Sequence, residues 1–214
     1  MKVVVFGASG KVGRRIVGQL LDNGHKVTAF VHHNSPFQAN TQNLQIIKGD
    51  IHKLADVKKA VAGNDKVVSA LGSWGTKQKD IVSAGTGNII EAMTICGVKR
   101  IVTVTGSEAW ASGDKLSLWN RLTHAVVKCT PVRRIMDDGE AHLRLLHDSQ
   151  LNWIVLRSPI MNSWGKPEGF VITDRRPAHW ITVNRRSVAL AMVELLSSQE
   201  QSCQAPYISR RKKL

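Results

Sequence analysis

The chain has 214 residues, of which 43% are hydrophobic and 21% charged, with 30 Lys and Arg against 16 Asp and Glu. This composition excludes a disordered chain, and no apolar run is long enough to cross a bilayer. The length suits one sizeable core rather than a nucleotide-binding domain plus an independent catalytic domain. We therefore expect one domain over residues 1–208 and a basic C-terminal tail over residues 209–214.

The formal charge of +14 favours anionic small molecules as ligands, because the field of the protein attracts them. The arginine doublets are scattered and match no nucleic-acid-binding motif, so a nucleic-acid partner is not favoured, although the net charge leaves it open. The three cysteines are far apart and odd in number, which argues against a disulfide framework or a metal site. No signal peptide fits before the first strand, so we expect a cytoplasmic monomer or homodimer without a membrane partner.

Residues 1–13 contain a buried strand that runs directly into a glycine-rich turn, and a helix follows over residues 14–22. In such a turn Gly7 permits the tight bend, Gly10 lets the backbone approach a pyrophosphate, and Gly13 lets the helix pack closely on the strand. The phosphates would then bind the free N–H groups at the start of the helix. A second strand at residues 24–31 favours a dinucleotide site. The alternative is a strand, turn and helix that bind no ligand.

The glycine spacing, Gly-x-x-Gly-x-x-Gly, resembles that of the extended and atypical short-chain dehydrogenase/reductase superfamily. The resemblance implies that the pyrophosphate is lined by Ala8, Ser9, Gly10, Lys11 and Val12. The Ser9 hydroxyl and the peptide N–H groups would act as donors, and Lys11 would add charge if it points inward. The alternative for Lys11 is an ordinary solvated lysine.

The residues after the second strand indicate which dinucleotide binds. An NAD site usually has Asp or Glu there to accept from the ribose 2′-hydroxyl, and that carboxylate repels the 2′-phosphate of NADP. This chain has His32 and His33 instead, and His32 stands where related NADP-binding proteins often have arginine. Because imidazole can donate to a phosphate, we expect NADP(H) to be favoured over NAD(H). Two exposed loop histidines are the alternative, but they leave the missing acid unexplained.

Strands and helices alternate along the rest of the chain. The pattern predicts strands at residues 44–50, 66–72, 100–106 and 151–156, and helices at residues 54–62 and 78–96. Short apolar runs joined by helical segments predict an α/β fold, with one Rossmann-type, doubly wound parallel sheet covered by helices on both faces. Ligands of such sheets bind beyond the carboxyl ends of the strands.

The second half resembles the NmrA-like, flavin-reductase-like branch of the atypical short-chain dehydrogenases, through Glu140-Ala141-His142, Arg157-Ser158-Pro159-Ile160 and residues 180–189. The resemblance implies a small substrate-side excursion over residues 158–182. It also implies that Asp50 and Ile51 border the adenine, that Ala70, Leu71 and Gly72 border the ribose beyond it, and that Ser158, Pro159 and Ile160 border the nicotinamide. Plain turn chemistry is the alternative for each of these positions.

The usual catalytic acid of the superfamily, the tyrosine of Tyr-x-x-x-Lys, is missing. The chain's only tyrosine, Tyr207, is near the C-terminus and has no lysine at that spacing. The nearest substitute is His124 with Lys128, four residues apart on one helix face, together with Ser107 at the end of the fifth strand. A solvated helix carrying both residues is the alternative.

Without an acid, a hydride acceptor must take its proton from water, which suits flavins and quinones. Thr105 and Ser107 would then only help to set the hydride geometry. The sequence therefore predicts an NADPH-dependent reductase of a flat acceptor. The alternative is an NADP(H)-binding redox sensor that does no chemistry. Trp74, Trp110 and Trp164 follow strands and could stack on such an acceptor, with Met161, Asn162 and Phe170 completing an apolar wall.

Overall fold

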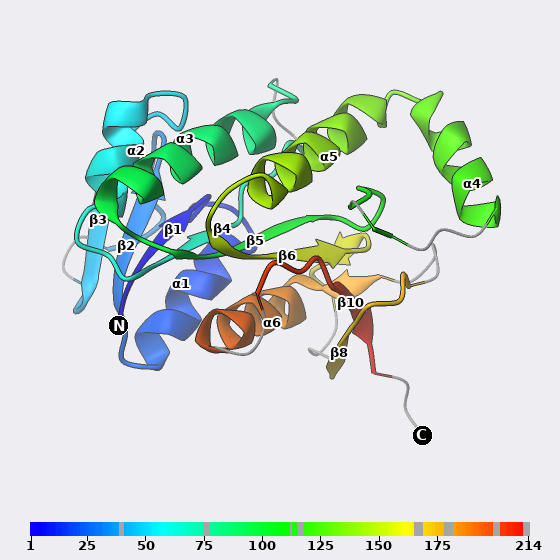
Figure 1. Ribbon diagram of the computed structural model, residues 1–214. Coiled ribbons are helices and arrows are strands. Elements are labelled where there is room, and N and C mark those ends of the chain that lie inside the picture. The colour runs from blue at the N-terminus through cyan, green and yellow to red at the C-terminus, as the bar shows by residue number, and fades with distance from the viewer. Residues whose placement is uncertain are drawn as a thin grey trace.

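The computed structural model describes residues 1–38, 41–74, 78–111, 113–114, 118–164, 169–177, 182–198 and 202–211. Its centre is an eight-stranded sheet with helices on both faces (Figure 1). The first half of the chain forms β1 (Lys2–Phe6), α1 (Gly13–Asp22), β2 (Lys26–Val31), β3 (Leu44–Lys48), α2 (Leu54–Val61), β4 (Lys66–Ser69), α3 (Ile81–Cys96) and β5 (Arg100–Gly106). These elements follow the predicted order.

The second half adds strands to the other edge of the sheet. It forms α4 (Leu118–Lys128), α5 (Arg133–His147), β6 (Asn152–Ser158), β7 (Met161–Asn162), β8 (Phe170–Thr173), β9 (Val183–Asn184), α6 (Arg185–Ser197) and β10 (Tyr207–Arg210). The strand order is β3-β2-β1-β4-β5-β6-β10-β8, and β7 and β9 form a separate parallel pair. Every neighbouring pair in the large sheet is parallel except β8 with β10. The predicted Rossmann-type fold is therefore confirmed.

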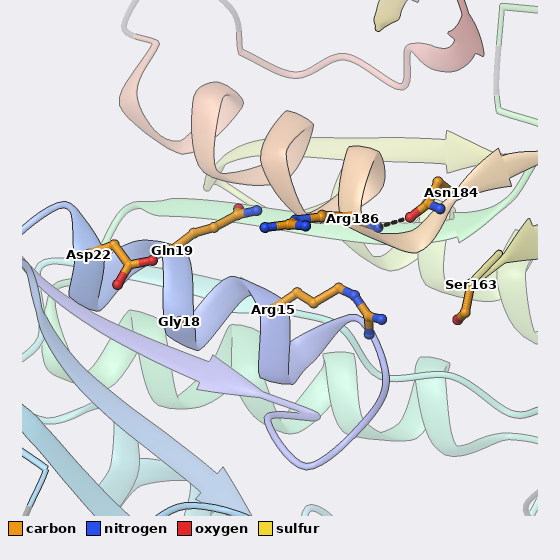
Figure 2. Close-up of a pocket in the computed structure, with 7 residues that line it drawn as sticks. All are labelled: Arg15, Gly18, Gln19, Asp22, Ser163, Asn184 and Arg186. Atoms are coloured by element: carbon orange, nitrogen blue, oxygen red, sulfur yellow. Dashed lines mark hydrogen bonds between the residues drawn. The ribbon is translucent and has the colours of Figure 1, made fainter. Parts of the chain in front are cut away.

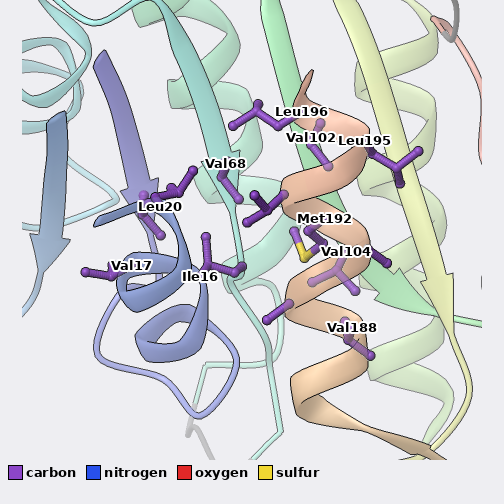
Figure 3. Close-up of a cluster of buried hydrophobic side chains, with 14 of the residues drawn as sticks. Ile16, Val17, Leu20, Val68, Val102, Val104, Val188, Met192, Leu195 and Leu196 are labelled. Carbon is purple, nitrogen blue, oxygen red and sulfur yellow. The ribbon is translucent and has the colours of Figure 1, made fainter. Parts of the chain in front are cut away.

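Each face of the sheet buries its own apolar core. Helices α1 and α6 pack on one face, and α2, α3 and α5 cover the other (Figure 1). On the first face, side chains of α1 and α6 meet Val68, Val102 and Val104 of the central strands (Figure 3). Strands buried on both sides explain the continuous Val- and Ile-rich runs in the sequence.

Two cations hold the C-terminal end of α6 beside the amino ends of the strands. Lys66, at the start of β4, donates its Nζ to the Leu196 carbonyl at 2.8 Å. Arg100, at the start of β5, donates Nη2 to the Leu195 carbonyl at 2.6 Å and Nη1 to Asn152 Oδ1 at 2.5 Å. Burial lowers the pKa of both cations. Positive charge at a helix C-terminus is stabilising, because the last carbonyls have no partners within the helix.

Several predicted boundaries were wrong. β4 ends at Ser69 rather than at residue 72, β3 ends at Lys48, and α3 begins at Ile81 rather than at residue 78. The basic tail was also misplaced, because Ser209 and Arg210 belong to β10 and pair with Val171 and Phe170 of β8. Residues 212–214 of the predicted tail lie outside the described residues. Pairing between distant strands recruits this segment, and local composition does not reveal such pairing.

Candidate functional site

The turn between β1 and α1 has the geometry that its three glycines predict. Gly7 has a φ of +69°, and a Cβ there would lie 2.6 Å from the Ala70 carbonyl oxygen. A Cβ on Gly13 would collide with the carbonyl of Gly7. A Cβ on Gly10, in contrast, would meet only the Gly7 oxygen, at 3.1 Å. The fold thus requires glycine at positions 7 and 13, whereas a Cβ at position 10 would make one tight contact with a backbone oxygen.

The start of α1 presents unused backbone donors. The Gly10 N–H donates to the Gly7 carbonyl at 3.0 Å, which closes the turn. Within the described residues, no hydrogen-bond acceptor is recorded for the N–H groups of Ser9, Lys11, Val12 and Gly13. The first turn of α1 contains no acidic residue. Exposed N–H groups and the positive end of the helix dipole suit an anion such as a pyrophosphate.

Two predicted contributions to this turn need qualification. Ala8 is fully buried and packs in the core, so only its backbone could line a phosphate. Lys11 is exposed, and its carbonyl accepts a hydrogen bond from Arg15 Nη1. Ser9 and Gly10 are also exposed, as a ligand-facing turn requires.

The end of β2 places two histidines at the surface. His32 directly follows β2, and the ring centroids of His32 and His33 lie 3.8 Å apart. Both side chains are exposed. Imidazole rings in such a position can donate to an anionic group without moving the backbone.

The turns after β3 and β4 are held from behind by α3. A Cβ on Gly85 of α3 would lie 2.8 Å from both Ile51 Cγ1 and Leu71 Cδ1. Asn88 of α3 donates its Nδ2 to the Ile51 carbonyl at 2.8 Å. Sequence reasoning missed both α3 residues, because a glycine inside a helix has no local signature of what it packs against.

Asp50 takes part in turn chemistry. Its Oδ1 accepts from the His52 N–H at 3.0 Å, and its own N–H donates to Asp56 Oδ2 at 2.9 Å. Ile51 is buried in the core, whereas Gly72 is exposed. These turns carry the structural role that was the alternative to binding, and the backbone of the turn after β4 lies beside Gly7, where a Cβ would be 2.6 Å from the Ala70 oxygen.

The carboxyl ends of β5 and β6 bring together residues that are fifty positions apart. The Ser107 N–H donates to the Ser158 carbonyl at 2.8 Å, and Ser107 itself is buried. Thr105 lies under α5, where a Cβ on Gly139 would be 2.7 Å from Thr105 Oγ1. Pro159 is buried and Ile160 is exposed. The predicted Ser107 and Ser158–Ile160 positions therefore lie at one edge of the sheet.

His124 and Lys128 do share one face of α4, and both contact the same carboxylate on α5. His124 Nε2 lies 2.8 Å from Glu140 Oε1, and Lys128 Nζ lies 2.9 Å from Glu140 Oε2. The hydrogen bond to Glu140 raises the pKa of Lys128. The His124 ring also stacks on Trp110, with centroids 3.5 Å apart. This buried cluster joins α4 to α5, which is a structural task whatever chemistry it also performs.

The tryptophans differ in their environments. Trp110 stacks on His124, whereas Trp74 is 72% exposed and Trp164 is 85% exposed. Met161, Asn162 and Phe170 are all half-buried. Exposed indole rings near the carboxyl edge are available to stack on a flat ligand.

A polar groove of about 450 Å³ lies behind the glycine turn, between α1 and the start of α6 (Figure 2). Its lining residues are Arg15, Gly18, Gln19, Asp22, Ser163, Asn184 and Arg186. Arg15 and Arg186 make the groove basic, and Asp22 partly offsets them. Sequence reasoning did not anticipate this groove, because its two sides come from helices at opposite ends of the chain.

The described residues contain no group of three His, Cys, Asp or Glu side chains placed to hold a metal ion. Within the same residues, no helix has the length and apolarity needed to cross a membrane.

Comparison with known proteins identifies the class. The NAD(P)H-binding family matches residues 7–199, so the chain belongs to that family. A 3-beta-hydroxysteroid dehydrogenase from Mycolicibacterium neoaurum is 31% identical over 132 residues, which cover 53% of this chain and 36% of that protein. A 2-alkyl-3-oxoalkanoate reductase from Stenotrophomonas maltophilia is 32% identical over 109 residues, covering 48% of this chain and 32% of that protein. The chain thus spans about a third of each of these curated relatives.

Solved structures match over nearly the whole chain. ChuY, an anaerobillin reductase from Escherichia coli O157:H7, has a TM-score of 0.80 at 20% identity and is covered to 99%, with 100% of this chain aligned. A short-chain dehydrogenase/reductase from Veillonella parvula, solved with NADP, has a TM-score of 0.76 at 15% identity, covering 98% of this chain and 94% of that one. The chain is therefore a member of the NAD(P)H-binding family, as its glycine turn predicted, and its fold is similar to that of a short-chain dehydrogenase/reductase.

Proposed function

We propose that this protein is an NADPH-dependent reductase of a flat acceptor such as a flavin or a quinone. The observation that carries the proposal is the start of α1, where no acceptor is recorded within the described residues for the backbone N–H groups on both sides of Gly10. The residues present fit a dinucleotide, because an anion there would satisfy donors that the fold leaves unused. The backbone of residues 9–13 would hold the pyrophosphate, and His32 would donate to a 2′-phosphate.

When bound, the reduced nicotinamide supplies a hydride, and the acceptor takes its balancing proton from water. The chain's own task is then to orient the two rings and to exclude competing reactions. Ser107 and the segment Ser158–Ile160 lie at one edge of the sheet, where they would position the nicotinamide and the acceptor. His124 is already engaged by Glu140 and Trp110, which supports a mechanism that does not depend on it.

The test is NADPH oxidation against a panel of flavins, quinones and small carbonyls, run beside NADPH and NADH binding titrations. We expect turnover with a flavin or a quinone, and a His124→Ala rate within about twofold of the unmodified rate. If His124 were a general acid, its loss would lower turnover by about a hundredfold or more. The exposed His147→Ala is the matched control.

A sensor that binds NADP(H) without chemistry is the second candidate, favoured by the missing Tyr-x-x-x-Lys motif. Tight NADPH binding with no oxidation across the whole panel would support the sensor and contradict the reductase. Loss of flavin and quinone reduction in a folded His124→Ala protein that still binds NADPH would contradict a proton taken from water.

A further inference from the structure

The carboxyl end of β6 and the start of β10 carry a buried charged cluster that the proposed reaction does not use. Arg157 of β6 donates Nη2 to Asp114 Oδ1 at 2.9 Å and Nη1 to Asp114 Oδ2 at 2.5 Å. The same guanidinium lies over the ring of Tyr207, 3.8 Å from its centroid. Tyr207 is paired with Arg157 of β6 and with Thr173 of β8. The chain's only tyrosine therefore lies in the sheet, beside a strand that ends at the candidate site.

A second ion pair lies beside the same tyrosine. Arg176 follows β8 and donates Nη2 to Glu108, the residue directly after Ser107. The Arg176 side chain is only 8% exposed. Its Nε and Nη1 are buried, and within the described residues they have no hydrogen-bond partner. A guanidinium that reaches from the substrate-side excursion to the end of β5 thus uses one of its three nitrogens.

Buried donors without acceptors are rare in native proteins, because each leaves its desolvation uncompensated. A group that the free protein leaves unpaired is explained when a ligand supplies the partner. For Arg176 the partner must be an acceptor, and an anionic acceptor makes the stronger, charge-assisted hydrogen bond.

Tyr207 supplies a second donor at the same place. Within the described residues, no hydrogen bond of its hydroxyl is recorded. Burial raises the pKa of Tyr207, so the phenol keeps its proton and can donate. The charged groups that face it are Arg157, Asp114, Arg176 and Glu108, which form two internally neutral pairs.

We propose that Arg176 and Tyr207 form a subsite that binds a carboxylate group of the acceptor. The inference rests on the proposed function, because it takes the small molecule reduced beside Ser107 as the ligand. The unpaired nitrogens of Arg176 require an acceptor, the Tyr207 hydroxyl can donate to the same group, and the planar guanidinium matches the two oxygens of a carboxylate. The two unpaired nitrogens of Arg176 are shielded from water, so ligand binding requires the Arg176 side chain to shift.

Two probes that differ only in charge test the subsite. Anthraquinone-2-carboxylate and anthraquinone-2-carboxamide share one flat ring system, and calorimetric titration measures each affinity with and without NADPH. We expect the unmodified protein to bind the carboxylate at least about tenfold more tightly than the carboxamide. Arg176→Gln should bring that ratio to about one, and Tyr207→Phe should lower it by about threefold, as loss of one hydrogen bond would.

The neighbouring Arg175→Gln is the matched control, because it removes the same charge from an exposed side chain. If Arg176→Gln fails to fold, Arg176→Gln combined with Glu108→Gln removes the whole ion pair and carries the same expectation. Equal affinity of the unmodified protein for the two probes would overturn the subsite. An equal effect of Arg175→Gln would also overturn it, since net charge would then explain the preference.

The outcomes separate this proposal from the proposed function. If the protein prefers the carboxylate but oxidises no NADPH, the subsite is supported and the proposed reductase activity is contradicted. If the protein oxidises NADPH with quinones but binds the carboxylate and the carboxamide equally, the reductase activity is supported and the subsite is contradicted.

Discussion

The two ends of the central sheet differ in how their polar groups are used. At the amino ends of the strands, Lys66 and Arg100 donate hydrogen bonds to the last carbonyls of α6, so these cations stabilise the fold. At the carboxyl ends, the turn before α1 and the Arg176 side chain have donors for which no acceptor is recorded within the described residues. A fold stabilises itself wherever donors and acceptors meet within the chain. The end where they do not meet is the end at which a ligand is expected.

The largest expected effect concerns the carboxyl ends of the strands, where the glycine turn lies. Replacing Gly10 with Leu should raise the NADPH Kd by at least about a thousandfold, because the side chain would occupy the place of the pyrophosphate. A Cβ at Gly10 would lie 3.1 Å from the Gly7 oxygen, so the unfolding free energy should fall by no more than about 1 kcal/mol. Gly18→Leu, on the helix that follows the turn and with open space around its Cβ, is the control. Fluorescence titration and thermal melting measure the two quantities, and unchanged NADPH affinity would make the turn structural only.

The next effect belongs to the core, between the two ends. Burial lowers the pKa of His142 to about 4 from 6.5, and its Nε2 lies 2.9 Å from Thr103 Oγ1. Because the unfolded chain binds a proton first, stability is full above pH 6.5 and falls as the pH drops toward 4. The expected loss is about 3 kcal/mol. Denaturant unfolding across this range should show a much flatter profile for His142→Gln, whereas the exposed His147→Gln should keep the slope.

Substitutions at the amino ends of the strands should change the stability of the fold and leave NADPH binding unchanged. Arg100→Met removes a buried donor from the Leu195 carbonyl and from Asn152, and should lower the unfolding free energy by about 2 kcal/mol. The NADPH Kd of the folded variant should be unchanged, because the lost contacts lie at the opposite edge of the sheet. Lys99→Met, an exposed neighbour, should change the unfolding free energy by less than about 0.5 kcal/mol. A shift in NADPH affinity would break the division between the two ends.

The smallest expected effect concerns the preference for NADPH over NADH. His32→Asp should reverse the preference for NADPH over NADH, each affinity moving by about tenfold, since a carboxylate accepts from a 2′-hydroxyl and repels a 2′-phosphate. Paired titrations with NADPH and NADH measure it, with His147→Asp as the charge control. Equal affinities at every pH would show that His32 does not contact the 2′-phosphate.

The sequence predicted those features of the fold that depend on residues close together in the chain. The buried strands and the roles of Gly7 and Gly13 follow from short runs of sequence, as does the shared face of His124 and Lys128. The meeting of Ser107 with Ser158 follows from the rule that parallel strands end at one edge. These features need only the chain near each residue and one general rule of topology.

What the sequence did not predict depends on distant pairing. Tyr207 was noted only as lying near the C-terminus, because nothing near it in sequence indicates that β10 inserts between β6 and β8. The pairing of Arg176 with Glu108 joins residues 68 positions apart. Glu140 was noted only as part of a motif, and its contacts with both His124 and Lys128 emerge only when α4 and α5 are packed.

Gly85 shows how such packing changes the interpretation of a variant. It lies inside α3 and touches no ligand-facing surface, yet its missing side chain leaves the room that Ile51 and Leu71 occupy. Any larger residue must displace the side chains of Ile51 and Leu71, which belong to the turns after β3 and β4. A survey of variants ranked by distance from the cofactor would count Gly85 among the neutral positions. Ranked by the backbone that it supports, Gly85 belongs with the glycines of the first turn.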